Sequence, residues 1–168
     1  MVQIYTGEGK GKTTAALGLT LRACGHGMRV FIAQFAKGMA YGELESMKRF
    51  ADLATLKQYG RRCFIHDRPE EEDIRLAQLG WTQVREAAAS GLYDILVLDE
   101  LGIALHYGLV SLEQVEELIQ GKAEALELVI TGRKVPESLF ALADLVTEMR
   151  EVKHYYTKGV KARKGIEY

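Results

Sequence analysis

The sequence predicts an α/β fold: a mostly parallel β-sheet with helices on both faces, formed by residues 1–168 as a single domain. Short apolar runs alternate with helical patterns along the chain, which is typical of βα units around a parallel sheet. A glycine-rich loop follows the first apolar run directly, as in P-loop proteins. No linker, repeat or low-complexity segment divides the 168 residues, and that length suits one core.

The predicted strands are short apolar runs that are bounded by turn residues or by helical patterns. The run DILVLDE is continuously apolar in its middle, which is typical of a strand buried on both faces. The run LATLKQY is the weakest of the set. The predicted strands cover residues 2–5, 30–35, 53–59, 94–100, 126–133 and 144–150.

Capping residues and glycines mark the first and last long helices. The first helix covers residues 12–24 and is expected to end at Gly25 and Gly27, because glycine adopts the positive φ angles found at helix ends. Ser111 and Gln114 fit a capping box that opens a later helix. Together these signals place one helix directly after the first strand and one before the fifth.

A third helix is predicted to start after Pro69, with the acidic residues 70–73 in its first turn. Its apolar residues recur at spacings of three and four and define a buried face: Ile74, Ala77, Trp81, Val84 and Ala88. We therefore interpret Trp81 as a core residue rather than a site residue. A short helix is also predicted after Pro136.

The composition argues against several classes of protein. Lys plus Arg (22) nearly balance Asp plus Glu (23), so no overall charge favours nucleic acid or membrane as a partner. Cys24 and Cys63 have no CxxC or His/Cys cluster nearby, so we expect neither a disulfide nor a zinc site. The first residues, MVQIYTGEGK, lack a basic region followed by a long apolar run, and we find no apolar stretch of about 18 residues. We expect a soluble, cytoplasmic protein.

The stretch GEGKGKTT after the first strand fits a Walker A loop. Such a loop needs glycines so that N–H groups can turn toward phosphate oxygens, a lysine to neutralise them and a hydroxyl to hold a metal ion. These groups are supplied by Gly9, Gly11, Lys12 and Thr13. The strict pattern has glycine where this chain has Thr6. A connecting turn needs no lysine and threonine at a helix start, so we interpret the loop as a nucleotide site. We expect Lys12 to sit at a solvent-facing loop.

A second part of a nucleotide site lies at the end of a later strand. The run ILVLDE places Asp99 at a carboxyl end, where a Walker B acid meets the Mg²⁺ of a nucleotide, and Glu100 follows directly. Ligands of parallel sheets lie beyond the carboxyl ends of the strands, so other strand ends become candidates too. These further candidates are Gln34, Lys37, Thr131, Gly132 and Arg133.

Motifs spread over nearly the whole chain are similar to those of one enzyme family. In chain order they are TGEGKGKTTAA, GHG, QFAKG, GE, LDEL, ITGR and VKHYYTKGVKARKGIEY. In this order and spacing they resemble the corrinoid adenosyltransferases of the P-loop type, which convert cob(I)alamin and cob(I)yrinic acid a,c-diamide to their adenosyl forms. The Walker element alone is common, whereas QFAKG combined with GVKARKGIEY is specific. Thr6 also fits, because that family's loop begins with threonine and glycine.

The resemblance implies a RecA-like sheet and a transferase reaction in cobalamin biosynthesis or salvage. Cobalt(I) of the corrinoid co-substrate attacks the 5′ carbon of ATP, and triphosphate is the leaving group. ATP would lie reversed in the loop, with Mg²⁺ bound, relative to ordinary NTPases. The resemblance also implies a homodimer and a transient reducing flavoprotein as partners.

The resemblance further implies roles for individual residues. Catalysis is assigned to Lys12, Thr13 and Glu100, and the metal ion to Thr13, Asp99 and Glu100. Nucleotide and corrinoid binding is assigned to Gly7, Glu8, Gly9, Lys10, Gly11, Lys12, Thr13, Thr14, Lys37, Arg133 and Phe64.

Two segments depart from the family or remain open. Family members often carry phenylalanine and then tryptophan two residues on, against the lower face of the corrin. Here Phe64 fits the first position, but His66 stands at the second. The basic ending KGVKARKGIEY either stays solvated, closes over the nucleotide or packs across a dimer.

Two other functions compete with adenosyl transfer. A RecA-like ATPase or small-molecule kinase would use the same loop for phosphoryl transfer, with Glu100 as the general base. A nucleotide-dependent binding module would instead use the loop to control a partner interaction. Only the adenosyltransferase would release triphosphate and form a light-sensitive cobalt–carbon bond.

Overall fold

The computed structural model describes residues 1–63, 65 and 68–168, and its sheet confirms the predicted α/β fold. The described strands form one parallel sheet in the order β3-β2-β4-β5-β1-β6. Their bounds lie within two residues of the predicted runs: β1 Val2–Thr6, β2 Val30–Phe35, β3 Ala54–Tyr59, β4 Ile95–Asp99, β5 Glu127–Thr131 and β6 Leu145–Glu148. The loop strand β1 and the acid-bearing strand β4 are therefore separated only by β5.

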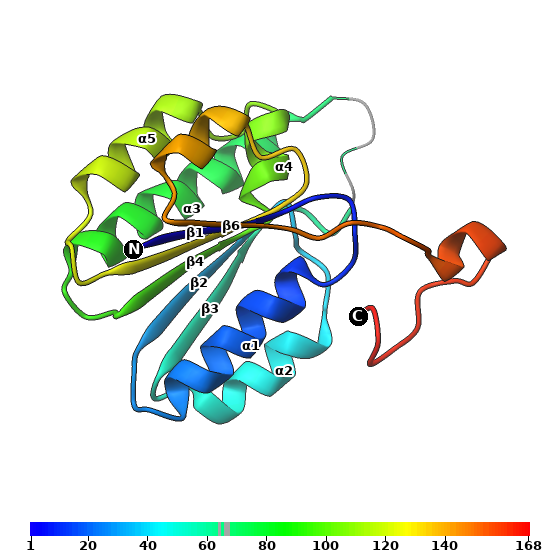
Figure 1. Cartoon of the computed structure of the whole chain (residues 1–168), viewed down its shortest axis with the longest axis horizontal. Helices are drawn as coiled ribbons and strands as arrows, with labels where there is room; N and C mark the ends of the chain where they lie inside the picture. The colour runs from blue at the N-terminus through cyan, green and yellow to red at the C-terminus, as the bar shows by residue number, and fades with distance from the viewer. Residues whose placement is uncertain (64, 66–67) are drawn as a thin grey trace.

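Helices cover both faces of the sheet, as predicted. In Figure 1, α1 and α2 lie on one face, and α3, α4 and α5 lie on the other. The α-helices are α1 Lys12–Cys24, α2 Gly42–Met47, α3 Glu71–Ala89, α4 Leu101–His106 and α5 Leu112–Gly121. The 3₁₀ helices are η1 Lys48–Phe50, η2 Glu137–Leu142 and η3 Tyr155–Lys158. The helix predicted after Pro136 is thus a 3₁₀ helix, and the short helices α2 and α4 were not predicted.

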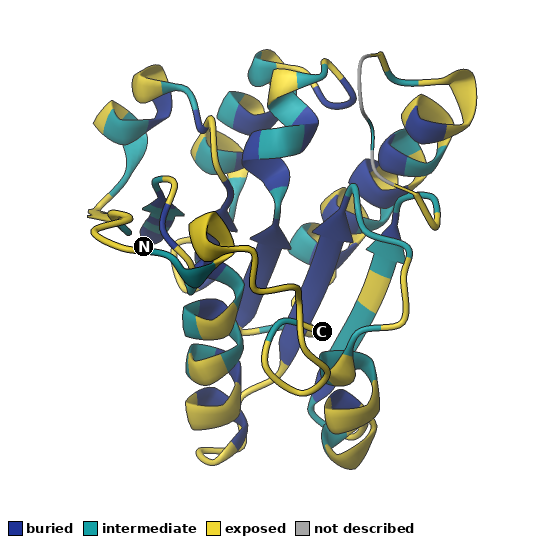
Figure 2. Ribbon diagram, turned by 90° about the vertical axis from the view of Figure 1, so that its right-hand side faces the viewer, coloured by how far each residue is buried: buried dark blue, intermediate teal, exposed yellow. Residues whose placement is uncertain are grey.

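Two apolar layers hold these helices on the sheet. Strand residues alternate between the layers, because successive side chains of a strand point to opposite faces. In β2, Val30 and Ile32 belong to the layer beneath α1 and α2, whereas Phe31 and Phe35 belong to the layer beneath the other helices. Figure 2 shows that the central strands are almost entirely buried, whereas the C-terminal segment is mostly exposed.

The cap and core predictions are confirmed in part. Ser111 and Gln114 form the expected capping box of α5, and Trp81 is 3% exposed in the core. Ile74 is 42% exposed, so its assignment to the buried face of α3 is wrong. Gly27 has the expected positive φ of 75°, but Gly25 has a φ of −62°, which any residue can adopt.

Candidate nucleotide and corrinoid site

The glycine-rich loop connects β1 to α1. It passes so close to the backbone of Met149 that a side chain would not fit there. The Gly9 N–H donates a hydrogen bond to the Met149 carbonyl oxygen over 2.6 Å. A Cβ atom at Gly9 would lie 2.5 Å from that oxygen. Gly11, directly before α1, has a φ of 119°, where other residues are strained. The loop is consequently held in one conformation, with the N-terminus of α1 at its mouth.

Lys12 lies inside this loop rather than facing solvent, so that expectation is wrong. Its side chain is largely buried, and its Nζ donates hydrogen bonds to the carbonyl oxygens of Gly7 over 2.5 Å and of Gly9 over 2.7 Å. Burial lowers the pKa of Lys12 from its ordinary value. Within the described part of the chain, carbonyl dipoles hold this ammonium without an anionic partner, which a phosphate oxygen would provide.

The Asp99 carboxylate is the centre of the site. It is 1% exposed, and each of its oxygens accepts two hydrogen bonds. Oδ1 accepts from the hydroxyls of Thr13 over 2.8 Å and Thr131 over 2.7 Å. Oδ2 accepts from Gln34 Nε2 over 3.1 Å and Lys37 Nζ over 2.8 Å. The structure thus brings together the loop threonine and four residues that the sequence places at strand ends.

Lys37 reaches the site from the loop after β2. Its Nζ lies 3.2 Å from Thr13 Oγ1 and pairs with Asp99, and its side chain is 15% exposed. Burial acts to lower the pKa of Lys37, but the charge and hydrogen bond of Asp99 outweigh burial and raise it. The backbone of this loop is closely packed, since a Cβ atom at Gly38 would lie 2.2 Å from the Gly60 carbonyl oxygen.

A second set of polar contacts extends the site to α2 and β3. Gln34 Nε2 also donates to Glu43 Oε1 over 3.1 Å, while Gln34 Oε1 accepts from Gln58 Nε2 over 3.1 Å. Sequence reasoning missed Glu43 and Gln58 as site residues. The GE motif was the only available signal for Glu43, and nothing in the sequence pairs Gln58 with Gln34.

Glu100 stands beside Asp99 in an unusual environment. Its backbone has a φ of 56°, and its N–H donates to Thr131 Oγ1 over 3.0 Å. Its Oε2 atom is buried without a hydrogen-bond partner in the described part of the chain. Burial, and then the charge of Asp99, raise the pKa of Glu100. This orphaned oxygen fits a magnesium ion, which takes oxygen ligands from one or two carboxylates and from substrate phosphates.

A cleft of about 1090 Å³ opens over these groups and is large enough for a nucleotide. Its lining includes most of the residues named from the sequence: Glu8, Gly9, Lys10, Gly11, Lys12, Thr13, Thr14, Lys37, Glu100 and Arg133. Asp99 lies buried beneath the lining. Ile65, Ile103 and Tyr107 add an apolar wall on the side of α4. The cleft therefore joins the glycine-rich loop to an apolar surface.

Comparison with known proteins identifies the family to which the chain with this cleft belongs. Residues 1–168 match the family model described as ATP:corrinoid adenosyltransferase BtuR/CobO/CobP. The corrinoid adenosyltransferase of Pseudomonas aeruginosa is 37% identical over 166 residues, which cover 98% of this chain and 82% of that protein. Those of Escherichia coli K12 and Salmonella typhimurium LT2 are 34% and 36% identical over 169 residues, covering 100% of this chain and 85% of each protein.

The chain belongs to the ATP:corrinoid adenosyltransferase family. As a member, it is an ATP:corrinoid adenosyltransferase whose substrates are ATP and a corrinoid, and the resemblance drawn from its motifs is confirmed. Within the described ranges, no helix has both the length and the apolar character needed to cross a membrane.

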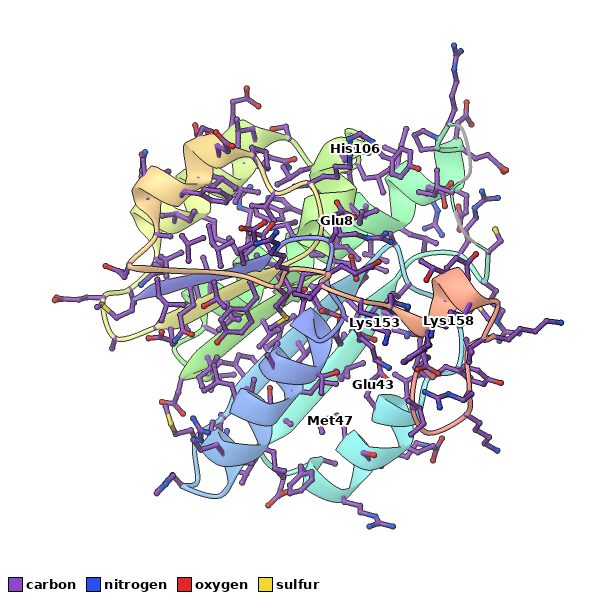
Figure 3. The ribbon with its side chains drawn as sticks, turned by 45° about the vertical axis from the view of Figure 1, so that its right-hand side comes forward. Glu8, Glu43, Met47, His106, Lys153 and Lys158 are labelled. Atoms are coloured by element: carbon purple, nitrogen blue, oxygen red, sulfur yellow. The ribbon has the colours of Figure 1, made fainter. Side chains whose placement is uncertain are left out.

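The C-terminal segment of this adenosyltransferase folds back onto the glycine-rich loop. Lys10 Nζ donates to the Tyr155 hydroxyl over 3.0 Å and to Glu167 Oε1 over 2.7 Å. Arg163 pairs with Glu167 over 3.2 Å, and Tyr155 also donates to Glu167. The hydrogen bonds from Arg163, Lys10 and Tyr155 hold the pKa of Glu167 well below its usual range. Figure 3 shows this segment, with Lys153 and Lys158, above α2 and Glu43.

Other residues named from the sequence contribute less to the cleft, or lie outside the described part of the adenosyltransferase. Arg133 Nη1 lies 3.8 Å from Glu8 Oε2, and both side chains are more than half exposed. Gly7 contributes its carbonyl oxygen to Lys12 rather than a wall of the cleft. Phe64 and His66 lie outside the described residues.

Proposed function

We propose that the cleft holds ATP with its triphosphate in the glycine loop and its 5′ carbon turned toward a reduced corrinoid. The observation that carries this proposal is the 2.8 Å hydrogen bond between Thr13 and Asp99, which joins the loop to the acid-bearing strand. The apolar wall beside Glu100 supports a corrin macrocycle next to the nucleotide. The phosphate subsite and the apolar subsite are then parts of one cleft, as adenosyl transfer requires.

In the proposed reaction, cobalt(I) supplies the electron pair for a new cobalt–carbon bond at the 5′ carbon. The bond between that carbon and the triphosphate oxygen breaks, and its electron pair leaves with the triphosphate. Negative charge therefore develops on the departing oxygen, and donors already aimed at it lower the barrier. No proton is removed from the nucleophile, so the reaction needs no general base.

Lys12 and the loop N–H groups would stabilise that leaving group. Among the described residues, Lys12 donates its hydrogen bonds to carbonyl oxygens, so a phosphate oxygen would offer it a stronger, charge-assisted partner. Lys10, Lys37 and Arg133 line the same cleft and are further cations for the triphosphate. Gly9, Gly11 and Thr14 complete the proposed cradle through their backbone.

Mg²⁺ fits between the loop hydroxyl and the two acids. Thr13, Asp99 and Glu100 would hold it, and the buried, unpartnered Oε2 of Glu100 supports this assignment. When bound, the ion supplies positive charge that favours the departure of triphosphate. Glu100 would then serve the metal ion and the ribose rather than activate water.

We also propose that residues 1–168 act as one domain, in the cytoplasm, within a homodimer. A transient flavoprotein partner would keep the corrinoid cobalt reduced, and Phe64 would contact the corrin. These proposals rest on the family, whereas the apolar wall of the cleft supports the corrin site directly. Sedimentation of the purified protein would test the dimer.

An anaerobic assay with ATP, Mg²⁺ and chemically reduced cobalamin tests the proposed function. We expect triphosphate and a light-sensitive cobalt–carbon bond to form in equal amounts. Lys12→Ala should lower turnover by on the order of 10²–10³, because one preorganised charge-stabilising donor is lost. Lys48→Gln, at the exposed first residue of η1, should have no effect. ADP and phosphate as the main products, or full turnover of Lys12→Ala with saturating ATP, would contradict the proposal.

A further inference from the structure

We infer that Lys37 Nζ fills the cation position of the metal site and that Mg²⁺ must displace it. This inference rests on the proposed metal role of Thr13 and Asp99. The ammonium lies 2.8 Å from Asp99 Oδ2 and 3.2 Å from Thr13 Oγ1. A metal ion held by the threonine hydroxyl and the carboxylate would have to lie in the same place.

The hydrogen bonds of Asp99 leave no lone pair for a metal ion. An ionised carboxylate offers about four acceptor sites. All four are used, by Thr13, Thr131, Gln34 and Lys37. Because Asp99 is 1% exposed, no additional ligand can approach it from solvent. Direct metal coordination by Asp99 therefore requires one of these four donors to leave.

Lys37 is the donor best able to leave. Thr131 is held by a second hydrogen bond, from the Glu100 N–H. Gln34 is fully buried, and Glu43 and Gln58 bind its amide. Lys37, in contrast, lines the cleft and carries its ammonium on a flexible side chain. The ammonium can therefore move without displacing a strand.

The charges around Lys37 explain why it occupies this position and what would release it. The carboxylates of Asp99, Glu100 and Glu43 all favour its charged form. A divalent ion entering beside the ammonium would be repelled by it, so the two cations should exchange rather than coexist. A bound triphosphate offers Lys37 another anionic partner. Metal binding should therefore be weak without the nucleotide and strong with it.

Mn²⁺, which is visible by electron paramagnetic resonance, is the probe for this test. In nucleotide-free protein, Lys37→Gln should bind Mn²⁺ at least about tenfold more tightly than the parent, because the competing ammonium is gone. Lys48→Gln removes the same charge at an exposed position, where Lys48 pairs with Glu45, and should behave like the parent. Lys37→Met, also uncharged, repeats the measurement if Lys37→Gln does not fold.

Inorganic triphosphate separates this inference from the metal site on which it rests. With triphosphate, the parent should gain Mn²⁺ affinity by a larger factor than Lys37→Gln does, and Asp99→Asn should lose binding. If the parent behaves in this way but Lys37→Gln binds Mn²⁺ alone no better than the parent does, the inference about Lys37 is wrong. If Asp99→Asn binds Mn²⁺ as the parent does under every condition, the metal site and the inference fail together.

Discussion

At the scale of single residues, Glu100 shows most clearly that the site is arranged for a ligand rather than for stability. Its backbone adopts the left-handed conformation, and one of its oxygens is buried without a partner in the described part of the chain. Such features destabilise a folded protein and are found mostly at functional sites. A cation at the proposed metal site would give the buried oxygen a partner.

We predict that Glu100→Gln stabilises the nucleotide-free protein. Burial raises the pKa of Glu100 above its ordinary value of 4.5, so ionisation is less favourable in the folded state than in the unfolded state. The variant should melt about 2–4 °C higher at neutral pH, which corresponds to about 1 kcal/mol for a chain of this size. It should also lose Mn²⁺ binding in the presence of triphosphate.

The pH dependence follows from the direction of this pKa shift. Below about pH 4.5, the carboxyl group is protonated in both states, and Glu100 has no destabilising charge. The destabilisation grows as the pH rises and is complete above the raised pKa of the folded state. The increase in melting temperature that Glu100→Gln causes, measured by calorimetry, should therefore become smaller as the pH is lowered from 7 to about 4.5. Glu117 is exposed, so Glu117→Gln serves as the control. An increase in melting temperature that does not change with pH, or that Glu117→Gln reproduces, would contradict this explanation.

At the scale of elements, long periodic or continuously apolar segments are predictable, whereas short ones are not. β4 and α3 are read directly from the sequence, because burial determines their apolar patterns. α2 and α4 have six residues each, fewer than two full turns, so no period is visible. α4 depends instead on Gly102, where a Cβ atom would lie 2.3 Å from the Arg133 carbonyl oxygen.

The packing of α3 on β3 supplies a second prediction. A Cβ atom at Gly80 would lie 2.4 Å from Cγ of Tyr59, a buried ring whose hydroxyl donates to Gln83. Burial raises the pKa of that hydroxyl to about 12. Gly80→Ala gains about 1 kcal/mol of helix propensity but overpacks the core by about 1–3 kcal/mol. The overpacking should win, because the contact is to the base of the ring.

Gly18→Ala is the matched control for this prediction. Gly18 lies in the middle of α1 and is exposed, and among the described residues an added Cβ would meet nothing within 4 Å apart from its neighbours and backbone in the same helix. Only the propensity gain applies there, so Gly18→Ala should raise the melting temperature, whereas Gly80→Ala should lower it. If both variants melt above the parent, the helix and strand can separate without a penalty, and α3 is not tightly packed on β3.

At the scale of the whole molecule, the sheet decides which sequence signals meet. Thr13, Asp99 and Thr131 are predictable as neighbours, because parallel strands place their carboxyl ends along one edge. Gln58 is not predictable as a neighbour of these residues. Its hydrogen bond to Gln34 depends on β3 lying beside β2, and the order of strands in the sheet is not visible in single segments of sequence. The return of the C-terminal segment to Lys10 is equally invisible, because it depends on polar contacts distant in sequence.

We predict that this returning segment is held mainly by Glu167. Glu167 accepts hydrogen bonds from Lys10, Tyr155 and Arg163, whereas Val160 and Ile166 are both exposed. Glu167→Gln removes the negative charge that two cations share, and little apolar contact remains to hold the segment in place. Amide hydrogens of residues 157–168 should then exchange much faster, while those of β1 and β4 keep their protection.

The same variant should raise the KM for ATP, because the segment forms one side of the cleft in which we propose that ATP binds. Ile166, Glu167 and Tyr168 line that cleft, so a loosened segment no longer encloses the substrate. Glu124→Gln removes an equal charge from an exposed position outside the cleft and should leave both the exchange rates and the KM unchanged. Equally rapid exchange of residues 157–168 in the parent and in Glu167→Gln would show that the segment is solvated in the free protein. In that case, the contacts of Lys10 would not restrain the chain end, and the wall of the cleft would form only when nucleotide binds.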